Sequence, residues 1–157
     1  LDDGTLYRLF RQSLAAHSST FATKYLFDCA GDKPVKLPGV SSVDFDRFLA
    51  LFYPRCASPA TCELTQPAEW TSVLRLAHLW EFPALRARAI QELARTGSAV
   101  DRIAAAREFA GLGELQIWLL PAFREACTER GWLDLVTVAD AERLGAGTIL
   151  AVARIRE

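Results

Sequence analysis

The residues best suited to acid–base or nucleophilic chemistry are scattered along the chain. The sequence contains two histidines, His17 and His78. His17 lies just before a predicted helix, His78 lies within a Leu- and Trp-rich helix, and no pattern places either beside a nucleophile. Sites of the Ser–His or Cys–His type are recognised by geometry rather than by spacing. The motifs therefore predict no catalytic residue, and a small enzyme with an unrecognised site is kept as an alternative.

The four cysteines show no metal-binding pattern. Cys29, Cys56, Cys62 and Cys127 include no Cys-x-x-Cys pair, and no histidine lies near the closest two. Zinc sites use closely spaced cysteine and histidine ligands. We expect no metal and reduced cysteines, as in an intracellular protein, cytoplasmic or nuclear. Cys127 is expected to be a small core residue, and a disulfide between Cys56 and Cys62 is the alternative.

Acidic residues and glycines also predict no site. Asp44 and Asp46 lie two residues apart on a predicted helix, so their side chains point to different sides and cannot share a cleft. Gly111-Leu112-Gly113 and Gly145-Ala146-Gly147 follow no predicted strand and do not complete a G-x-G-x-x-G motif. These glycines are interpreted as helix ends, and we expect no cofactor.

The tryptophans are candidates for stacking on ligands or bases. Trp70 and Trp80 fall on or beside helical faces that are predicted to be buried, so we expect both to pack in the core. Trp132 follows Gly131 and is the residue that we expect to be an exposed contact aromatic.

Composition describes a globular chain without a strong charge bias. Of the 157 residues 51% are hydrophobic and 24% are charged, and the formal net charge is −1. This length suits one domain, or one domain with a small appendage. A near-neutral chain gives no reason to expect nucleic acid, and no apolar run approaches the ~20 residues that span a bilayer. Neither DNA binding nor membrane insertion is therefore predicted.

The beginning of the chain predicts a hairpin. Asp3-Gly4 is a hairpin-turn signal, and the β-branched and aromatic run Thr5 to Phe10 is typical of a strand. A hairpin needs a strand on each side of its turn, so we expect a first strand before Leu1 that this chain lacks. The chain also contains no Met, which favours a fragment of a longer product. Val35-Lys36-Leu37 is predicted as a second short strand.

Most of the remaining chain is predicted to be helical. Ser41 with Asp44 resembles a capping box, and the apolar side chains that follow it recur at helical spacing. Pro67 and Pro83 suit the first turns of two further helices. Ser98 with Asp101 begins another helix, and only helices follow. The expected fold class is therefore α+β, mostly helical, with a small sheet.

The segment from Leu6 to Leu93 resembles the BTB/POZ domain. Four features carry the likeness: Leu14-x-x-x-Ser18-x-x-Phe21, the short strand Val35-Lys36-Leu37, the helix that ends Leu49-Ala50-Leu51-Phe52-Tyr53, and the helix Val73 to Trp80. The resemblance implies a BTB/POZ fold, a small sheet flanked by helices, here without its first strand. It implies a domain over residues 1–97 and a helical extension over residues 98–157.

A closer likeness, over nearly the whole chain, is to BTB proteins abundant in mushroom-forming fungi. Its segments include Val35-Lys36-Leu37-Pro38-Gly39-Val40, Asp44-Phe45-Asp46-Arg47-Phe48-Leu49, Phe52-Tyr53-Pro54, Glu69-Trp70-Thr71-Ser72-Val73-Leu74, Trp80-Glu81-Phe82, Val100-Asp101-Arg102-Ile103 and Trp118-Leu119-Leu120-Pro121-Ala122.

The resemblance implies a protein-interaction and oligomerisation module without catalysis. The family forms homodimers largely through its first strand and first helix, which implies contacts by Leu9, Phe10 and Leu14. The absent first strand puts homodimerisation of this chain in doubt.

Some family members recruit cullin-type ubiquitin ligases, so the resemblance also implies a second role, that of a substrate adaptor. In that role Phe48, Phe52 and Glu63 would contact the cullin. Here Thr61 stands in the loop Thr61-Cys62-Glu63 where such members carry a large hydrophobic residue. The adaptor function is therefore kept as an alternative.

Overall fold

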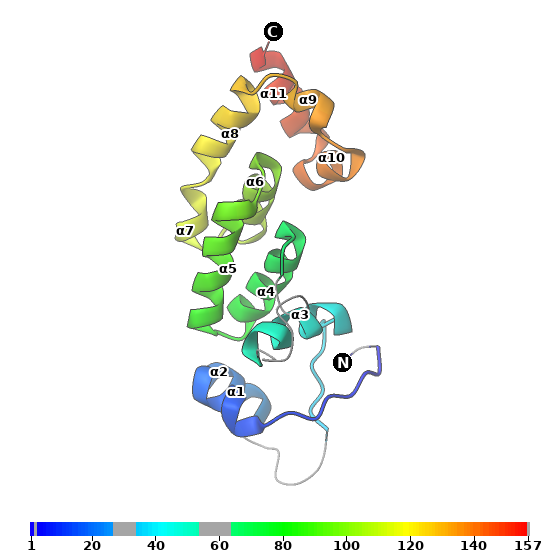
Figure 1. Ribbon diagram of the computed structural model, residues 1–157, viewed down its shortest axis with the longest axis vertical. Helices are drawn as coiled ribbons and strands as arrows, with labels where there is room; N and C mark the ends of the chain where they lie inside the picture. Colours follow the sequence, from blue (N-terminus) through cyan, green and yellow to red (C-terminus); the bar gives the residue numbers. More distant parts are fainter. Residues whose placement is uncertain (2, 27–33, 54–63, 157) are drawn as a thin grey trace. The chain divides into compact units, whose positions relative to one another are not determined.

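The computed structural model describes residues 1, 3–26, 34–53 and 64–156, and Figure 1 shows the order of its helices. They are α1 (Arg11–His17), α2 (Ser19–Phe21), the π-helical turn η1 (Ala22–Leu26), α3 (Ser42–Phe52), α4 (Pro67–Leu79), α5 (Pro83–Thr96), α6 (Ala99–Glu108), α7 (Gly113–Gln116), α8 (Leu119–Thr128), α9 (Trp132–Leu135), α10 (Val138–Leu144) and α11 (Ala146–Arg156).

The chain divides into two compact units, Leu1–Glu92 and Leu93–Glu157. The division falls inside α5, whereas the sequence predicted a boundary after residue 97. None of the helices in the described ranges has the length and apolarity needed to cross a membrane.

The predicted small sheet is wrong. Residues 5–10 and 35–37 are extended, but none of the residues described lies in a β-strand. A strand is defined by main-chain hydrogen bonds to a neighbour, and in the described part of the chain the N–H groups of residues 6–10 donate none. The expected α+β class with a BTB/POZ sheet is therefore corrected to helices joined by extended segments.

An aromatic cluster forms the core of the first unit. The ring of Phe48 lies 5.3 Å from that of Trp80 and 5.1 Å from that of Phe82, both edge to face. Phe21 of α2 contacts Trp80 at 5.1 Å, also edge to face. Edge-to-face pairs add to the free energy gained by burying the rings. The predictions that Trp70 and Trp80 pack inside are confirmed, since their exposed fractions are 3% and 1%.

Ser18 connects this core to a helix start. Its Oγ accepts a hydrogen bond from the Phe21 N–H at 2.9 Å and so caps α2. The same hydroxyl donates to the carbonyl oxygen of Trp80. Ser18 is only 4% exposed, and its hydroxyl both donates and accepts a hydrogen bond within the protein.

The predicted starts of the longer helices are confirmed. Ser41 Oγ accepts a hydrogen bond from the Asp44 N–H at 3.1 Å before α3. Before α4, the Glu69 carboxylate accepts one from the Gln66 N–H at 3.0 Å. Pro67 begins α4, where its missing N–H costs no helical hydrogen bond.

The second unit has its own apolar core. Helices α8 and α11 pack against each other, and α6 packs against α8 (Figure 1). Trp132 belongs to this core and is 4% exposed. The prediction of an exposed contact aromatic there is wrong, because Gly131 adopts φ 71° in the turn that precedes α9 and the ring is buried. Cys127 packs at the edge of the same core, half-buried.

Two capping boxes of the second unit share one arginine. In each box, Ser98 with Asp101 and Thr137 with Asp140, the hydroxyl and the carboxylate satisfy each other's main-chain N–H group. Arg143 Nη1 lies 2.8 Å from Asp101 Oδ1 and 3.5 Å from Asp140 Oδ1. The start of α6 is thereby tied to α10.

Substitution of Phe48 tests the aromatic core. Phe48→Ala removes a ring that is 0% exposed, so we expect the free energy of unfolding to fall by about 3–5 kcal/mol. Urea denaturation followed by circular dichroism measures this change. The control is Phe10→Ala, whose side chain is 76% exposed, and which should change stability by no more than about 0.5 kcal/mol. Equal losses for the two variants would contradict the assignment of the core.

Candidate protein-interaction groove

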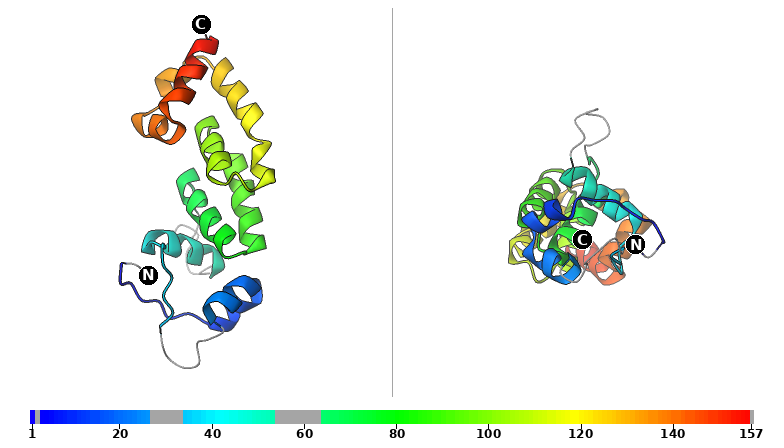
Figure 2. Two further views of the ribbon diagram at one scale, coloured as in Figure 1. Left: turned by 180° about the vertical axis from the view of Figure 1, so that it is seen from behind. Right: turned by 90° about the horizontal axis from the view of Figure 1, so that it is seen from below.

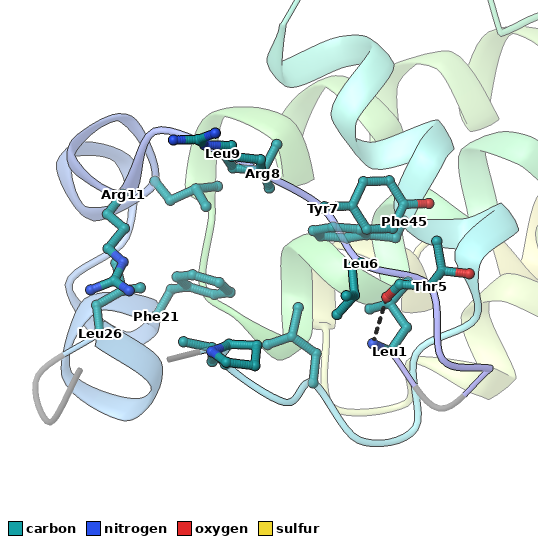
Figure 3. Close-up of a pocket in the computed structure, with 14 residues that line it drawn as sticks. Leu1, Thr5, Leu6, Tyr7, Arg8, Leu9, Arg11, Phe21, Leu26 and Phe45 are labelled. Carbon is teal, nitrogen blue, oxygen red and sulfur yellow. Dashed lines mark hydrogen bonds between the residues drawn. The ribbon is translucent and has the colours of Figure 1, made fainter. Parts of the chain in front are cut away.

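A groove of about 560 Å³ lies beside the extended N-terminal segment (Figure 3). Residues 5–9 line one part of it, and Pro34, Val35 and Leu37 line another. Figures 1 and 2 show these two extended segments running close to each other before α1 and α3. Phe21 and Leu26 contribute apolar surface from α2 and η1. Extended main chain thus borders the groove, and most of the side chains that line it are apolar.

Tyr7 holds the extended segment against α3. Its ring meets the Phe45 ring edge to face at 4.9 Å, as Figure 3 shows. Its hydroxyl donates a 2.7 Å hydrogen bond to Asp46 Oδ1. Leu9 packs against the same apolar core. The segment is therefore anchored by side chains, and among the described residues its main chain forms no β-ladder.

Asp3 fixes the turn from which the segment departs. Its carboxylate accepts hydrogen bonds from the Thr5 N–H at 2.9 Å and the Ser42 N–H at 3.2 Å. Gly4 adopts φ +81°, its N–H donates to the Leu1 carbonyl, and the Leu1 amine donates to the Thr5 carbonyl at 3.1 Å. These bonds confirm the predicted hairpin-type turn, with Leu1 opposite Thr5.

The outer face of the segment is exposed. Leu6 is 80% and Phe10 is 76% exposed, and Arg8 between them is exposed as well. Tyr7 and Leu9 point inward, so side chains alternate between the two sides with the period of a β-strand. The segment thus has the side-chain alternation of a strand, N–H groups at residues 6–10 that donate to no described residue, and large exposed apolar side chains.

The pKa values of two side chains in this region, Tyr7 and Asp3, are shifted. Burial, followed by the hydrogen bond and the negative charge of Asp46, raises the pKa of Tyr7 to about 12. The hydrogen bonds from Ser42 and Thr5 hold the pKa of Asp3 well below its usual range. The stabilisation linked to the raised pKa of Tyr7 should therefore fade as the pH rises from 10.0 towards 12. The stabilisation linked to the lowered pKa of Asp3 should fade as the pH falls below 3.8.

The residues predicted to contact partners have different surroundings. Phe10 is exposed and Leu9 is half-buried at the groove. Leu14 is 4% and Phe48 is 0% exposed. Both side chains are enclosed by the core, whereas the predicted partner contacts of the four residues stay predictions.

The other residues predicted for an adaptor surface are not brought to the groove. Phe52 is half-buried and stacks on Phe48 at 6.1 Å. Glu63 lies outside the described residues, as do Cys29, Cys56 and Cys62. Leu6 and Arg8, which sequence reasoning missed as contacts, lie at the groove instead.

The candidate catalytic and metal-binding side chains do not assemble in the described ranges. His17 Nδ1 lies 2.8 Å from the Ser13 carbonyl oxygen, and its ring packs edge to face on Phe52. The hydroxyl of the neighbouring Ser18 is engaged by Trp80 and Phe21. Among the residues that the structure describes, His, Cys, Asp and Glu form no group of three able to hold a metal ion.

Comparison with known proteins returns no family model, no curated protein and no solved structure that matches the chain. The resemblance to BTB/POZ domains therefore stays a prediction.

The Tyr7 anchor can be tested by titration. Between pH 10 and pH 12 deprotonation should cancel the stabilisation that Tyr7 gives at neutral pH, since its pKa is raised to about 12. We expect the difference in melting temperature between wild type and Tyr7→Phe to shrink over this range. Differential scanning calorimetry measures it.

Asp46→Asn is the matched control, because it keeps an oxygen acceptor but removes the charge. In that variant Tyr7 should deprotonate nearer pH 10.0, its ordinary pKa. If the difference in melting temperature between wild type and Tyr7→Phe stays constant up to pH 12, the role of Tyr7 as an anchor is contradicted.

Proposed function

We propose that this chain is a non-catalytic protein-interaction module that binds a partner polypeptide along residues 6–10. The observation that carries the proposal is that the main-chain N–H groups of residues 6–10 donate to none of the described residues, while the side chains of Leu6 and Phe10 are exposed. Extended main chain with open hydrogen-bonding groups is a template for pairing with another chain.

The energetics favour occupation of this segment. A partner that covers Leu6 and Phe10 removes two large apolar side chains from water, and burial of apolar surface contributes about 25 cal/mol per Å². Main-chain hydrogen bonds to the partner add to this without demanding a particular side chain. Affinity would thus come from the main chain and the apolar pair, and selectivity from neighbouring side chains.

The sequence favours the same class of function. BTB/POZ domains, which the chain resembles, act through their surfaces, and the predicted homodimer also used the N-terminal region. We propose an intracellular location, cytoplasmic or nuclear, because the sequence spacing favours no disulfide, and Cys127 has a free thiol.

Charge substitution at the outer face tests the module. The partners of the wild-type chain are first captured from cells and identified, and one is purified. We expect Leu6→Asp and Phe10→Asp each to weaken its binding at least about tenfold, because a buried charge without a partner is costly. Isothermal titration calorimetry measures the affinities.

The matched control is Ile117→Asp, which alters an equally exposed apolar side chain in the second unit: Ile117 is 73% exposed. This variant should bind like wild type. If the Leu6 and Phe10 variants bind the partner as well as wild type, the proposed site is wrong.

A further inference from the structure

We propose that a second copy of the chain packs antiparallel, about a two-fold axis, on the exposed face of α7 and α8. This contact goes beyond the proposed function and does not depend on it, because it involves a different surface. Two exposed apolar side chains, Ile117 and Leu120, form its centre. The opposite charges of Glu114 and Arg124 lie at its two ends.

The short helices α7 and α8 follow one nearly continuous helical path (Figure 1). The two residues that join them have helical backbone angles, φ −63° and ψ −20° for Ile117 and φ −76° and ψ −23° for Trp118. Residues three and four positions apart on such a path are neighbours on its surface. Ile117, Leu120, Pro121 and Arg124 therefore share one side of the path.

This side faces solvent. Ile117 is 73% and Leu120 is 72% exposed, and Arg124 is exposed as well. Ala122 and Ala126 mark the other side of α8, since both are 0% exposed and lie in the core against which α6 and α11 pack. Residues 93–156 are all described, so both sides of α8 are defined within the second unit. Adjacent exposed apolar side chains with polar neighbours are typical of a contact surface.

Charges of opposite sign lie on either side of the apolar pair. Glu114 is exposed in the first turn of α7, before Ile117, and Arg124 is exposed one turn after Leu120. A two-fold axis midway between the two charged residues places Glu114 opposite Arg124 of the second copy, and the axis repeats this pair at the other end. Between the two pairs, Ile117 and Leu120 of each copy meet the apolar face of the other.

The two charged side chains can form this pair in their present state. Glu114 has a contact within its own chain, and a carboxylate offers about four lone-pair sites, so it can accept a further donor. The Arg124 guanidinium forms no ion pair or hydrogen bond with another residue of the described ranges. Pairing between two copies therefore adds to the interactions of each chain instead of replacing them.

The charge pattern selects the antiparallel arrangement of two copies. In a parallel pair Glu114 would lie opposite Glu114 and Arg124 opposite Arg124, and like charges brought together at an interface are unfavourable. In the antiparallel pair one surface supplies both members of each charge pair, which is the self-complementarity that a two-fold contact requires. A second copy is for this reason the occupant that fits the face.

The contact is small, so the dimer should be weak. From Ile117 to Arg124 the face spans about two helical turns, which is less than the ~800 Å² that each partner buries in an interface of standard size. We therefore expect a concentration-dependent dimer with a dissociation constant on the order of 100 µM.

Sedimentation equilibrium of the full chain tests the contact, over concentrations from about 10 µM to about 1 mM that bracket the expected constant. Leu120→Asp should weaken association at least about tenfold, because dimerisation would bury a charge without a partner. The matched control is Val138→Asp in α10, where the side chain is 78% exposed. This control should associate like wild type.

Exchange of the two charges gives the decisive comparison. Glu114→Arg alone and Arg124→Glu alone each place like charges opposite each other at both ends, and each should weaken the dimer roughly tenfold. An equimolar mixture of the two variants should associate as strongly as wild type, since a chain with two arginines then faces a chain with two glutamates. In a parallel pair, neither single variant would associate more weakly than wild type.

Four outcomes would overturn the proposed dimer. The first is a wild-type chain that stays monomeric at the highest concentration. The second is a Leu120→Asp variant that associates like wild type. The third is a mixture of charge variants that associates no more strongly than either variant alone. The fourth is a dimer that Leu6→Asp dissociates. Leu120→Asp should still bind the partner of residues 6–10 like wild type, so failure of the dimer and failure of the proposed function are distinguishable.

Discussion

The structure of the first unit depends on the packing of aromatic rings around Phe48 and Trp80. These rings come from α2, α3 and the end of α4, and they leave almost no exposed surface on the two central residues. Close packing of this kind makes the position of each ring depend on its neighbours. Phe45 is part of the same cluster, and Tyr7 rests on Phe45. The extended N-terminal segment is therefore positioned by the aromatic core rather than by a sheet.

The way in which the segment is held bears on the binding proposed for it. Side-chain anchors at Tyr7 and Leu9 fix the segment, and the N–H groups of residues 6–10 donate to none of the residues that the structure describes. Fixing the segment beforehand lowers the conformational entropy that a partner must offset on binding. For the proposed function, a segment held in place beforehand would therefore bind a partner at a lower entropic cost than a flexible tail of the same composition.

Local chemistry made the helix starts predictable from sequence. Ser18, Ser41 and Ser98 accept hydrogen bonds from N–H groups a few residues later, so each signal lies within one short stretch. The absence of a sheet among the described residues could not be predicted in this way, because residues 5–10 become a strand only if a second chain segment supplies hydrogen bonds. The residue types of Thr5 to Phe10 indicated an extended conformation, but they could not show that no described segment pairs with it.

The candidate site was partly predictable for the same reason. Phe10 was identified through a family likeness, whereas Leu6 and Arg8 share its face by the two-residue period and could have been found from that alone. The burial of Leu14 and Phe48 was not predicted, because a likeness to a family carries over positions in the sequence but not the exposure of their side chains. Trp132 was wrongly predicted to be exposed. The course of the chain after Gly131 depends on the left-handed backbone conformation of that glycine, and the neighbouring residues do not indicate where the chain then turns.

The hydroxyl of Ser18 makes folding of the first unit cooperative across a long stretch of sequence. Its cap on α2 closes within three residues, but its second bond reaches Trp80, 62 positions along the chain. Closing so long a loop carries an entropic cost that local contacts do not. Because one oxygen serves both ends, α2 and the final turn of α4 stabilise each other, and fraying at either end should loosen the other.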